Sequence, residues 1–454
     1  MFVNRETEIS RLRKVLANET AQLVVIYGRR RCGKSTLIKR IMDSSTVYFS
    51  ADLREAPLQI KALAERIDNI IPGFSVPVYL GWDALFRSLN RSLHDRITLC
   101  IDEFPYLVKN SPELPSLLQN IHDDQSHSNF NLILCGSSQM MMHDMVLNKK
   151  APLYGRAGEI MKINPMSVHH LMGFLCLTPE QAVREYSVWG GIPRYWEIRK
   201  ASASFEEALE YQVVNPYGLL ADESERLFSD EIRTSVQSFT LLSLIGSGCH
   251  RLSEIAARMG KPATHLSGAL AFLIGLKYVR REIPFGESIR STKKTLYKID
   301  DPFLNFWFTF IAPDKSRIDL GLTSQVLSDI REKMPIYISS VWEELCRKAV
   351  PFLMPDKNFN PASRWWGKSK DGSSMELDVV ALSADKKVLL AGEVKWGEKT
   401  DLTAEYEILK KKTANLPIAK GCKIIHVIFV RHKPLSMPPD LIVLGPEEVV
   451  EALK

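Results

Sequence analysis

The chain contains 454 residues, of which 45% are hydrophobic and 25% are charged, and its formal net charge is +6. This length predicts two to four domains with separate cores. No apolar run approaches the roughly 20 residues that span a bilayer, and the opening segment lacks the pattern of a secretory signal. Seven dispersed cysteines without a CxxC pair argue against a disulfide framework and a structural zinc site. We therefore expect a cytoplasmic protein with no membrane segment.

The segment QLVVIYGRRRCGKSTLIKRI predicts an apolar strand, a turn and a helix. Gly28, Gly33, Lys34 and Ser35 have the G-x-x-x-x-G-K-[ST] spacing of a phosphate-binding loop. Glycine lets backbone N–H groups surround phosphate, Lys34 can reach the terminal phosphates, and the Ser35 hydroxyl can bind Mg²⁺. Thr36, the next residue, completes the predicted nucleotide contacts of this loop.

Two further predicted strands end in polar residues. RITLCIDEFPYL ends in Asp102, expected to hold Mg²⁺, and Glu103, expected to orient or deprotonate the attacking water. NLILCGSS ends in Ser137 and Ser138, where a polar side chain can sense the terminal phosphate. Arg156 is a candidate to neutralise transition-state charge, and a surface salt bridge is the alternative. The order of these motifs favours hydrolysis over binding alone.

The opening FVNRETEISRLRKVL predicts an amphipathic helix capped by Asn4. This segment and five later motifs resemble the archaeal ATPase family, a group of AAA-like, signal-transducing P-loop ATPases. The later motifs are YGRRRCGKST, CIDEFPYL, LILCGSS, PLYGRAGEI and WGGIPRYW. The resemblance implies ATP as the nucleotide and a lid after the ATPase core. It also implies that Asn4 and Arg5 flank the adenine and that Gly191 and Pro193 lie beside the nucleotide.

The middle of the chain is strongly basic. From Arg251 to Lys298 it contains ten Lys and Arg residues against three Glu, a net charge of +7. HRLSEIAARMG and KPATHLSGALAFLIGLKYVRRE predict two helices, and IPFGESIRSTKKTLYKI predicts two strands and a loop. This order resembles a winged helix-turn-helix. The following DDPFLNFWFTFI predicts a helix that fills the core.

A winged helix would face DNA with Lys261, Thr264 and His265 of its second predicted helix, and with Lys293 and Lys294 of its wing. A basic focus suggests a polyanionic partner. The alternative is a protein-docking or lid module with a solvated basic face, because charge gives backbone affinity without sequence preference. DNA is the predicted partner, and a protein partner or a homo-oligomer stays open.

Near the C-terminus, SSMELDVVALSADKKVLLAGEVKWGEK predicts a β-hairpin with Asp378 on the first strand and Glu393 and Lys395 on the second. Two carboxylates held together repel unless a cation lies between them. A nearby lysine can position water for attack on phosphate, while Mg²⁺ or Mn²⁺ stabilises the leaving oxygen. The preceding helix, ISSVWEELCRKAVPFL, carries Glu343 and Glu344.

This arrangement resembles the catalytic core of the PD-(D/E)xK nucleases, and SRWWGKS with the hairpin resembles the DUF234-type domain joined to many archaeal ATPases. The nuclease resemblance implies that Glu343 or Glu344 of the preceding helix completes the metal site, and we expect Glu344 in this role. We expect a multidomain α/β chain with a P-loop ATPase core at 1–165, a helical lid at 166–232, a winged-helix region at 233–315 and a nuclease-like domain at 330–454. One expected function is an ATPase that couples its nucleotide state to a metal-dependent nuclease acting on DNA. The alternatives are a STAND-type regulatory switch with an inert C-terminal domain, and a transcription regulator.

Overall fold

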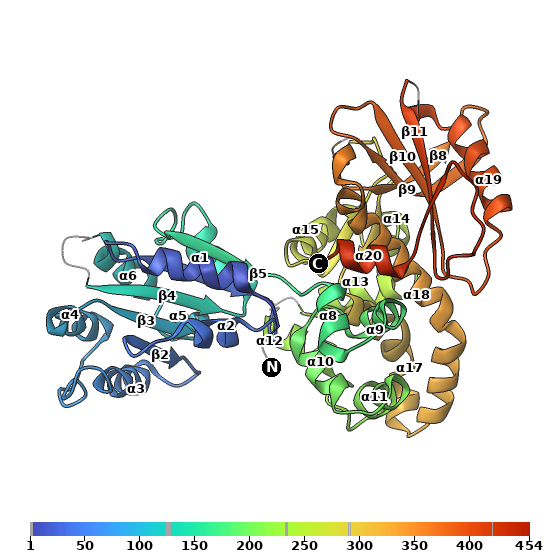
Figure 1. The fold of residues 1–454 in the computed structure, drawn as a ribbon. Helices are drawn as coiled ribbons and strands as arrows, with labels where there is room; N and C mark the ends of the chain where they lie inside the picture. The colour runs from blue at the N-terminus through green and yellow to red at the C-terminus, as the bar shows by residue number, and fades with distance from the viewer. Residues whose placement is uncertain (1–2, 124–128, 232–234, 289, 291, 420) are drawn as a thin grey trace. The chain divides into compact units, whose positions relative to one another are not determined.

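The computed structural model describes residues 3–123, 129–231, 235–288, 290, 292–419 and 421–454. The chain divides into two compact units, Met1–Pro165 and Met166–Lys454 (Figure 1). Among the helices of the described residues, none combines the length and the apolar character needed to cross a membrane.

A five-stranded parallel sheet forms the centre of the first unit, with the strand order β2-β3-β4-β1-β5. The strands are β1 (Leu23–Gly28), β2 (Thr46–Ser50), β3 (Ile97–Asp102), β4 (Phe130–Gly136) and β5 (Glu159–Ile163). Strands β3 and β4 are buried along their whole length. Continuous burial is typical of parallel strands covered on both faces. The parallel order brings the carboxyl ends of β1, β3 and β4 to one edge of the sheet.

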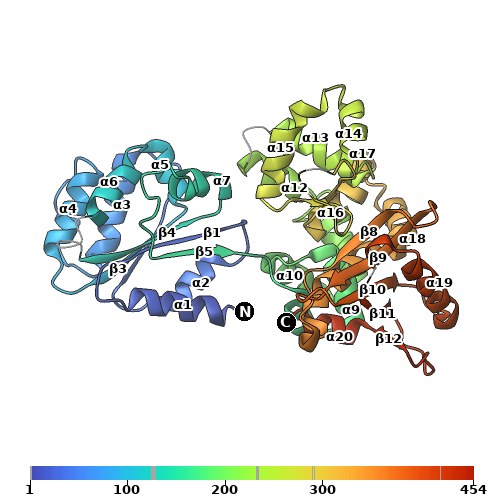
Figure 2. The same cartoon turned by 90° about the horizontal axis from the view of Figure 1, so that it is seen from above.

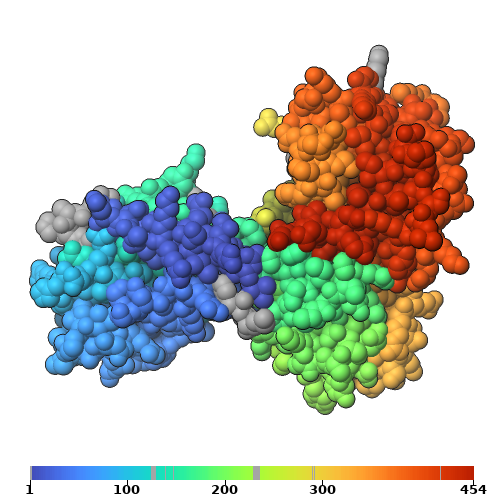
Figure 3. Space-filling model, viewed as in Figure 1, coloured from blue at the N-terminus to red at the C-terminus, as the bar shows by residue number. Residues whose placement is uncertain are grey.

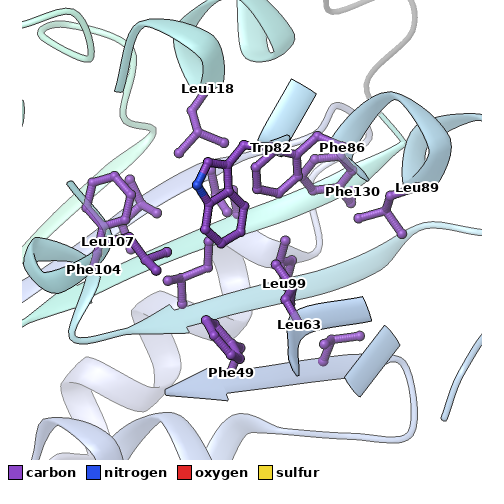
Figure 4. Packing of buried hydrophobic residues seen from close by; sticks show 14 of the residues in the cluster. Phe49, Leu63, Trp82, Phe86, Leu89, Leu99, Phe104, Leu107, Leu118 and Phe130 are labelled. Carbon is purple, nitrogen blue, oxygen red and sulfur yellow. The ribbon is translucent and has the colours of Figure 1, made fainter. Parts of the chain in front are cut away.

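Helices pack around this sheet and complete its core. They are α1 (Glu6–Leu16), α2 (Lys34–Ile41), α3 (Ala56–Asp68), α4 (Trp82–Ser92), α5 (Phe104–Asn110), α6 (Leu114–Asp123) and α7 (Gln139–Met142), followed by the π-helical turn η1 (His143–Leu147). Figure 4 shows Trp82 and Phe86 of α4 packed with Leu99 of β3 and Phe104 of α5. The Trp82 indole donates a 2.9 Å hydrogen bond to Ser111 Oγ, so its polar atom is satisfied inside the core.

The start of α1 differs from the sequence prediction, and the capping role of Asn4 is wrong. The N-cap residue is Arg5, with φ 85° and ψ 20°, and no side chain caps the helix. Asn4 also has a positive φ of 52°. The Arg5 guanidinium donates to the Asn164 carbonyl at 2.6 Å and to Glu8 at 2.9 Å. The contact with Asn164 comes from outside the helix, so local capping rules cannot anticipate it.

Helices dominate the N-terminal part of the second unit. They are α8 (Val168–Leu175), α9 (Pro179–Trp189), α10 (Pro193–Lys200), α11 (Phe205–Leu209), η2 (Glu210–Val214), α12 (Glu223–Glu231), α13 (Ser235–Gly246), α14 (Leu252–Met259), α15 (Ala263–Gly275), α16 (Pro302–Phe306), η3 (Trp307–Ile311) and α17 (Ala312–Asp319). Figure 2 shows α13, α14 and α15 side by side. In Figure 3 the red C-terminal segment, which includes α20 (Pro446–Ala452), covers part of the green surface of α8 and α9.

The short antiparallel pair β6 (Val279–Glu282) and β7 (Leu296–Ile299) follows α15. The sequence predicted helix through Glu282, and this is wrong, because the helix ends at Gly275 and Lys277 takes a left-handed φ of 60°. Pairing of Val279 with Ile299 buries both side chains, so sheet formation outweighs continuation of the helix. The aromatic segment in α16 and η3 fills the core as predicted.

The C-terminal part of the second unit contains a long helix and a second sheet. These elements are α18 (Thr323–Leu353), η4 (Pro355–Lys357), β8 (Ser363–Lys368), β9 (Ser374–Leu382), β10 (Val388–Lys395), α19 (Leu402–Ala414), η5 (Pro417–Ala419), β11 (Lys423–Val430) and β12 (Leu441–Leu444). The strand order is β12-β11-β10-β9-β8. The predicted hairpin is confirmed, since β9 and β10 pair antiparallel, and β10 pairs parallel with β11. The sequence predicted only the second half of α18, from Ile338 onward. The helix in fact starts at Thr323 and continues through Pro335, a residue that usually breaks or kinks a helix.

Candidate functional site

The loop between β1 and α2 is built on two glycines and a buried lysine. A Cβ atom at Gly28 would lie 2.4 Å from the Ile163 carbonyl oxygen, so no side chain fits there. Gly33 has a φ of 89°, which glycine adopts without strain. The Lys34 ammonium donates 2.9 Å hydrogen bonds to the carbonyl oxygens of Gly28 and Arg29. The loop therefore leads directly into the backbone N–H groups at the start of α2, which can donate hydrogen bonds to a phosphate.

Ser35 and Asp102 come together beside this loop. Asp102 Oδ2 accepts 2.6 Å hydrogen bonds from the hydroxyls of Ser35 and Tyr48, and Oδ1 accepts from the Glu103 N–H at 2.9 Å. Burial alone would raise the pKa of Asp102, but the hydrogen bonds donated by Ser35 and Tyr48 hold it below its usual value. An ionised carboxylate beside a hydroxyl is a set of oxygen ligands that fits Mg²⁺.

Glu103 and Ser137 form the second contact at this edge of the sheet. Glu103 has a φ of 52°, an uncommon conformation for a residue with a side chain. Its Oε2 atom accepts hydrogen bonds from the Ser137 hydroxyl at 2.8 Å and from the Ser137 N–H at 3.3 Å. The neighbouring Ser138 Oγ accepts from the Met141 N–H at 3.4 Å. The ends of β3 and β4 are thus linked through a carboxylate that points along the sheet edge.

Sequence reasoning missed two residues at this edge. Tyr48 lies on β2 outside any motif, and only the pairing of β2 with β3 brings it to Asp102. Arg30 occupies a variable position of the phosphate loop and donates to the Tyr106 hydroxyl at 2.7 Å and to Ser137 Oγ at 3.4 Å. The run of three arginines inside the loop was the available signal for it. Thr36 is exposed in the first turn of α2.

Arg156 is engaged with Asp123 in the first unit. Its Nε and Nη2 atoms donate to the two Asp123 oxygens at 2.7 and 2.9 Å, and Nη1 donates to the carbonyls of Pro152 and Tyr154. This bidentate pair is the salt bridge that the sequence left open as the alternative. A role at the nucleotide requires that the guanidinium exchanges Asp123 for phosphate.

The residues expected at the adenine, Asn4 and Arg5, belong to the first unit, and those expected beside the nucleotide, Gly191 and Pro193, belong to the second. Arg5 links the start of α1 to Asn164 at the end of β5, and Asn4 precedes it. Gly191 and Pro193 belong to the second unit, where the Gly191 carbonyl accepts a hydrogen bond from Met166 N–H at 2.8 Å and Pro193 begins α10. Their approach to a nucleotide stays a prediction.

The hairpin β9–β10 carries two carboxylates at one end. Asp378 Oδ2 accepts a 3.0 Å hydrogen bond from Val394 N–H, and Glu393 is only 4% exposed. Burial and the charge of Asp378 raise the pKa of Glu393 to about 7, against the opposing effect of Lys412. Like charges held together in this way favour a cation between them. Mg²⁺ commonly takes one or two carboxylates with water and phosphate, so this pair fits a divalent cation.

Two lysines lie at these carboxylates. Lys395 Nζ is 3.0 Å from Glu405 Oε2 and 4.0 Å from Glu393 Oε2. Lys412 Nζ, from α19, is 2.6 Å from Glu393 Oε1. Lys412 belongs to no sequence motif, and it reaches β10 because α19 packs against the sheet. Glu405, which pairs with Lys395, also belongs to no sequence motif, so the sequence did not predict it.

Glu344 lies in a separate ion network. Its ion-pair partners are Arg347, Lys348 and Arg280, at 3.2, 3.4 and 3.5 Å. Burial would raise the pKa of Glu344, but these three cations lower it to about 2. The neighbouring Glu343 interacts with Asp378 instead, because burial and the negative charge of Asp378 raise the pKa of Glu343. Glu343 is therefore the helix carboxylate that lies under the influence of Asp378, and the choice of Glu344 as a metal ligand stays a prediction.

Arg347 joins this network to the hairpin. Its Nη1 atom donates to the Asp378 carbonyl oxygen at 3.0 Å and to Glu343 Oε2 at 3.4 Å. Across the described part of the chain, no three His, Cys, Asp or Glu side chains gather closely enough to hold a metal ion. The candidate centre is therefore the pair Asp378 and Glu393, without a third carboxylate in place.

The predicted DNA-contact residues are all exposed. Lys261 precedes α15, Thr264 and His265 lie in its first turn, and Lys293 and Lys294 lie in the β6–β7 loop. Lys294 Nζ forms a 2.7 Å ion pair with Glu287 of the same loop. The basic side chains thus occupy two surfaces, one on α15 and one on the loop.

The parallel sheet, the glycine-bounded loop and the Ser35–Asp102 pair define a P-loop ATPase. Residues 2–197 match the family model described as an ATPase domain predominantly from Archaea. Residues 307–411 match the DUF234 model, described as archaeal and bacterial proteins of unknown function. The chain belongs to the archaeal ATPase family that carries this C-terminal domain.

Known relatives agree with this assignment. The chain is 32% identical over 409 residues to an uncharacterised protein of Methanocaldococcus jannaschii, covering 88% of this chain and 89% of that protein. A 47-residue segment is 40% identical to an uncharacterised ATP-binding protein of the same organism, covering 10% of this chain and 80% of that protein. A Walker-type ATPase of Pyrococcus abyssi has a similar fold, with a TM-score of 0.52 and 21% identity over 68% of this chain and 96% of that structure.

Proposed function

We propose that this ATPase couples its nucleotide state to a metal-dependent nucleic-acid-cleaving site in its C-terminal domain. The observation that carries the proposal is the meeting of Asp378 and Glu393 on one hairpin, with Lys395 Nζ 4.0 Å from Glu393. Carboxylates and a lysine in this order resemble the PD-(D/E)xK nucleases. When bound, Mg²⁺ or Mn²⁺ would polarise phosphate and stabilise the leaving oxygen. Lys395 positions the attacking water.

In the first unit, each residue at the sheet edge has a proposed role in ATP hydrolysis. Lys34 and the N–H groups of α2 bind the phosphates, and Ser35 and Asp102 hold Mg²⁺. Glu103 orients the attacking water, and its hydrogen bond with Ser137 supports that role because it fixes the carboxylate. Ser137 and Ser138 sense the terminal phosphate, Thr36 contacts the phosphates, and Asn4 and Arg5 flank the adenine.

We further propose that α13, α14 and α15 with β6 and β7 act as a winged helix. The order of three helices and an antiparallel strand pair supports this proposal. Lys261, Thr264 and His265 would contact duplex DNA from α15, and Lys293 and Lys294 from the wing. Their exposure leaves them accessible to phosphate.

A second candidate function is a regulatory switch whose C-terminal domain binds without cleaving. The observation that favours it is the 2.6 Å contact of Lys412 with Glu393, because an ammonium occupies a carboxylate that a metal would need. In that case ATP hydrolysis would reset a binding surface.

The two candidates differ in one experiment. Plasmid, linear and single-stranded DNA are incubated with Mg²⁺ or Mn²⁺, with and without ATP, using the intact protein and the Lys395→Ala variant. Metal-dependent cleavage that disappears in Lys395→Ala supports the nuclease, and an ATP effect supports coupling. Absence of cleavage on every substrate, with ATP turnover intact, supports the switch.

A further inference from the structure

A groove of about 1160 Å³ lies between the β6–β7 loop and the β8–β9 hairpin, both in the second unit. The residues of the loop wall include Arg281, Lys293, Lys294 and Thr295. The residues of the hairpin wall include Trp365, Trp366, Lys368 and Glu376. Strand β8 is the edge of its sheet, so this groove borders the end of the C-terminal domain.

The two walls are joined to each other. The Phe285 N–H, just after β6, donates a 2.9 Å hydrogen bond to the Arg364 carbonyl on β8. The Phe285 side chain packs against the hydrophobic core of the C-terminal sheet. A Cβ atom at Gly367 would lie 3.6 Å from Lys294 Nζ, so the loop also approaches β8 closely. Both walls of the groove therefore belong to the second unit and are packed against each other.

The groove is positively charged with an aromatic side chain in its wall. Both acidic residues that line it are already in ion pairs, Glu287 with Lys294 and Glu376 with Arg364. Lys293 and Lys368 are exposed in opposite walls and add positive charge.

The aromatic side chain is Trp366, which is partly exposed. The Arg364 guanidinium lies 5.8 Å from the centroid of its ring. An aromatic face flanked by cations fits a ligand that carries both phosphate and a planar base.

We propose that this groove binds a single-stranded segment of nucleic acid, with a base stacked on Trp366 and phosphates on Lys293 and Lys368. The inference rests on the proposed function, because it names where the C-terminal domain receives its substrate. The strand must be unpaired at this point, since a base inside a duplex already stacks on its neighbours and cannot cover the indole.

One residue that lines the groove, Glu376, lies close in the chain to the candidate metal pair. Glu376 lies opposite Trp366 in the β8–β9 pairing, and Asp378 follows two residues later on β9. With a rise of roughly 3.3 Å per strand residue, the Cα atoms of Glu376 and Asp378 are about 7 Å apart. The groove wall at Glu376 therefore lies about 7 Å along β9 from Asp378.

The test measures binding of fluorescently labelled single-stranded and duplex oligonucleotides to the full-length protein, in EDTA so that no cleavage occurs. Trp366→Ala should weaken single-strand affinity roughly 5- to 100-fold, and Trp366→Phe should retain most of it. Lys293→Ala with Lys368→Ala should weaken binding and reduce its salt dependence. Lys387→Ala, an exposed lysine in the β9–β10 turn, is the matched control and should have no effect.

The outcomes separate this inference from the proposed function. Unchanged single-strand affinity in folded Trp366→Ala and in the double lysine variant would overturn the proposal that the groove binds nucleic acid. Loss of duplex binding in Lys261→Ala would support the separate winged-helix contact even then. Competition by polyglutamate as strong as by unlabelled oligonucleotide would also overturn the groove proposal, because an acidic peptide would then be the ligand. Single-strand binding that depends on Trp366 in a protein that never cleaves DNA would uphold the groove and count against the nuclease.

Discussion

The Ser35 hydroxyl donates a 2.6 Å hydrogen bond to Asp102 Oδ2, although the two residues are 67 positions apart in the chain. One residue comes from the phosphate loop and the other from the end of β3. The same Asp102 oxygen accepts a hydrogen bond from the Tyr48 hydroxyl, so two strands and one helix meet at a single carboxylate. Substitutions of the residues at this edge of the sheet should therefore change ATP turnover.

Lys34→Ala should reduce ATP turnover by roughly 100-fold or more, because removing a charged donor from a preorganised phosphate site costs several kcal/mol. The buried ammonium is held in the loop by its hydrogen bonds to the carbonyl oxygens of Gly28 and Arg29. Phosphate release and ATP binding by calorimetry measure the effect. Lys61→Ala, an exposed lysine on α3, is the control, and equal activity of the two variants would contradict the assignment.

Glu103→Gln should retain ATP binding and lose turnover, since the amide keeps the shape of the side chain but cannot act as the carboxylate that orients water. Ser137→Ala should lower kcat by a smaller factor, because Glu103 loses its 2.8 Å hydrogen bond. Single-turnover hydrolysis separates chemistry from binding. Full turnover in Glu103→Gln would remove Glu103 as the water-orienting residue.

Arg156→Ala and Asp123→Ala should have opposite effects on hydrolysis. Loss of Arg156 should lower kcat if its guanidinium reaches the nucleotide, whereas loss of Asp123 releases the guanidinium from its bidentate pair and should maintain or raise kcat. Activity per molecule at several protein concentrations shows whether Arg156 acts within one chain or on a second copy. Equal kcat in all three proteins would leave Arg156 with the salt bridge alone.

Arg280→Met should destabilise the second unit by up to about 3–5 kcal/mol, because it removes one of the cations that compensate two buried carboxylates. Arg280 lies 2.9 Å from Glu282 and 3.5 Å from Glu344. Calorimetry should show a lower melting temperature for one transition, with ATP binding by the first unit unchanged. Arg226→Met, which removes an exposed arginine of the same unit, serves as the comparison, and equal stability of the two variants would contradict a role for the network.

The same network predicts how stability depends on pH. The pKa of Glu344 is lowered from 4.5 to about 2 in the folded chain. A lowered folded-state pKa means that its contribution is complete above about pH 4.5 and is lost as the pH falls toward 2. Glu344→Gln should therefore flatten the stability profile below pH 4.5, as measured by urea unfolding at a series of pH values.

Lys412→Met should strengthen binding of Mn²⁺ to the C-terminal domain, because the ammonium no longer competes for Glu393 and the two carboxylates repel more strongly. Electron paramagnetic resonance of free Mn²⁺ measures the affinity without any cleavage. Lys411→Met, an exposed neighbour on α19, is the matched control. Weaker binding in Lys412→Met would mean that this lysine supports the site.

The sequence by itself determined the local motifs. The spacing of Gly28, Gly33 and Lys34 requires a loop that wraps phosphate, and an apolar strand ending in Asp102 requires a buried parallel strand, because both patterns depend on neighbours in the chain. The β9–β10 hairpin followed in the same way from alternation and a turn. Each of these patterns is short enough for local propensity and periodicity to encode it.

Only the tertiary structure decided which side chains from distant segments meet. Tyr48 reaches Asp102 because β2 pairs with β3, and Lys412 reaches Glu393 because α19 packs on the sheet. The choice between Glu343 and Glu344 depends on the rotation of α18 against β9, since adjacent helical residues point about 100° apart. Arg5 begins α1 through a contact with Asn164. Such contacts depend on packing between segments, which no local sequence pattern records.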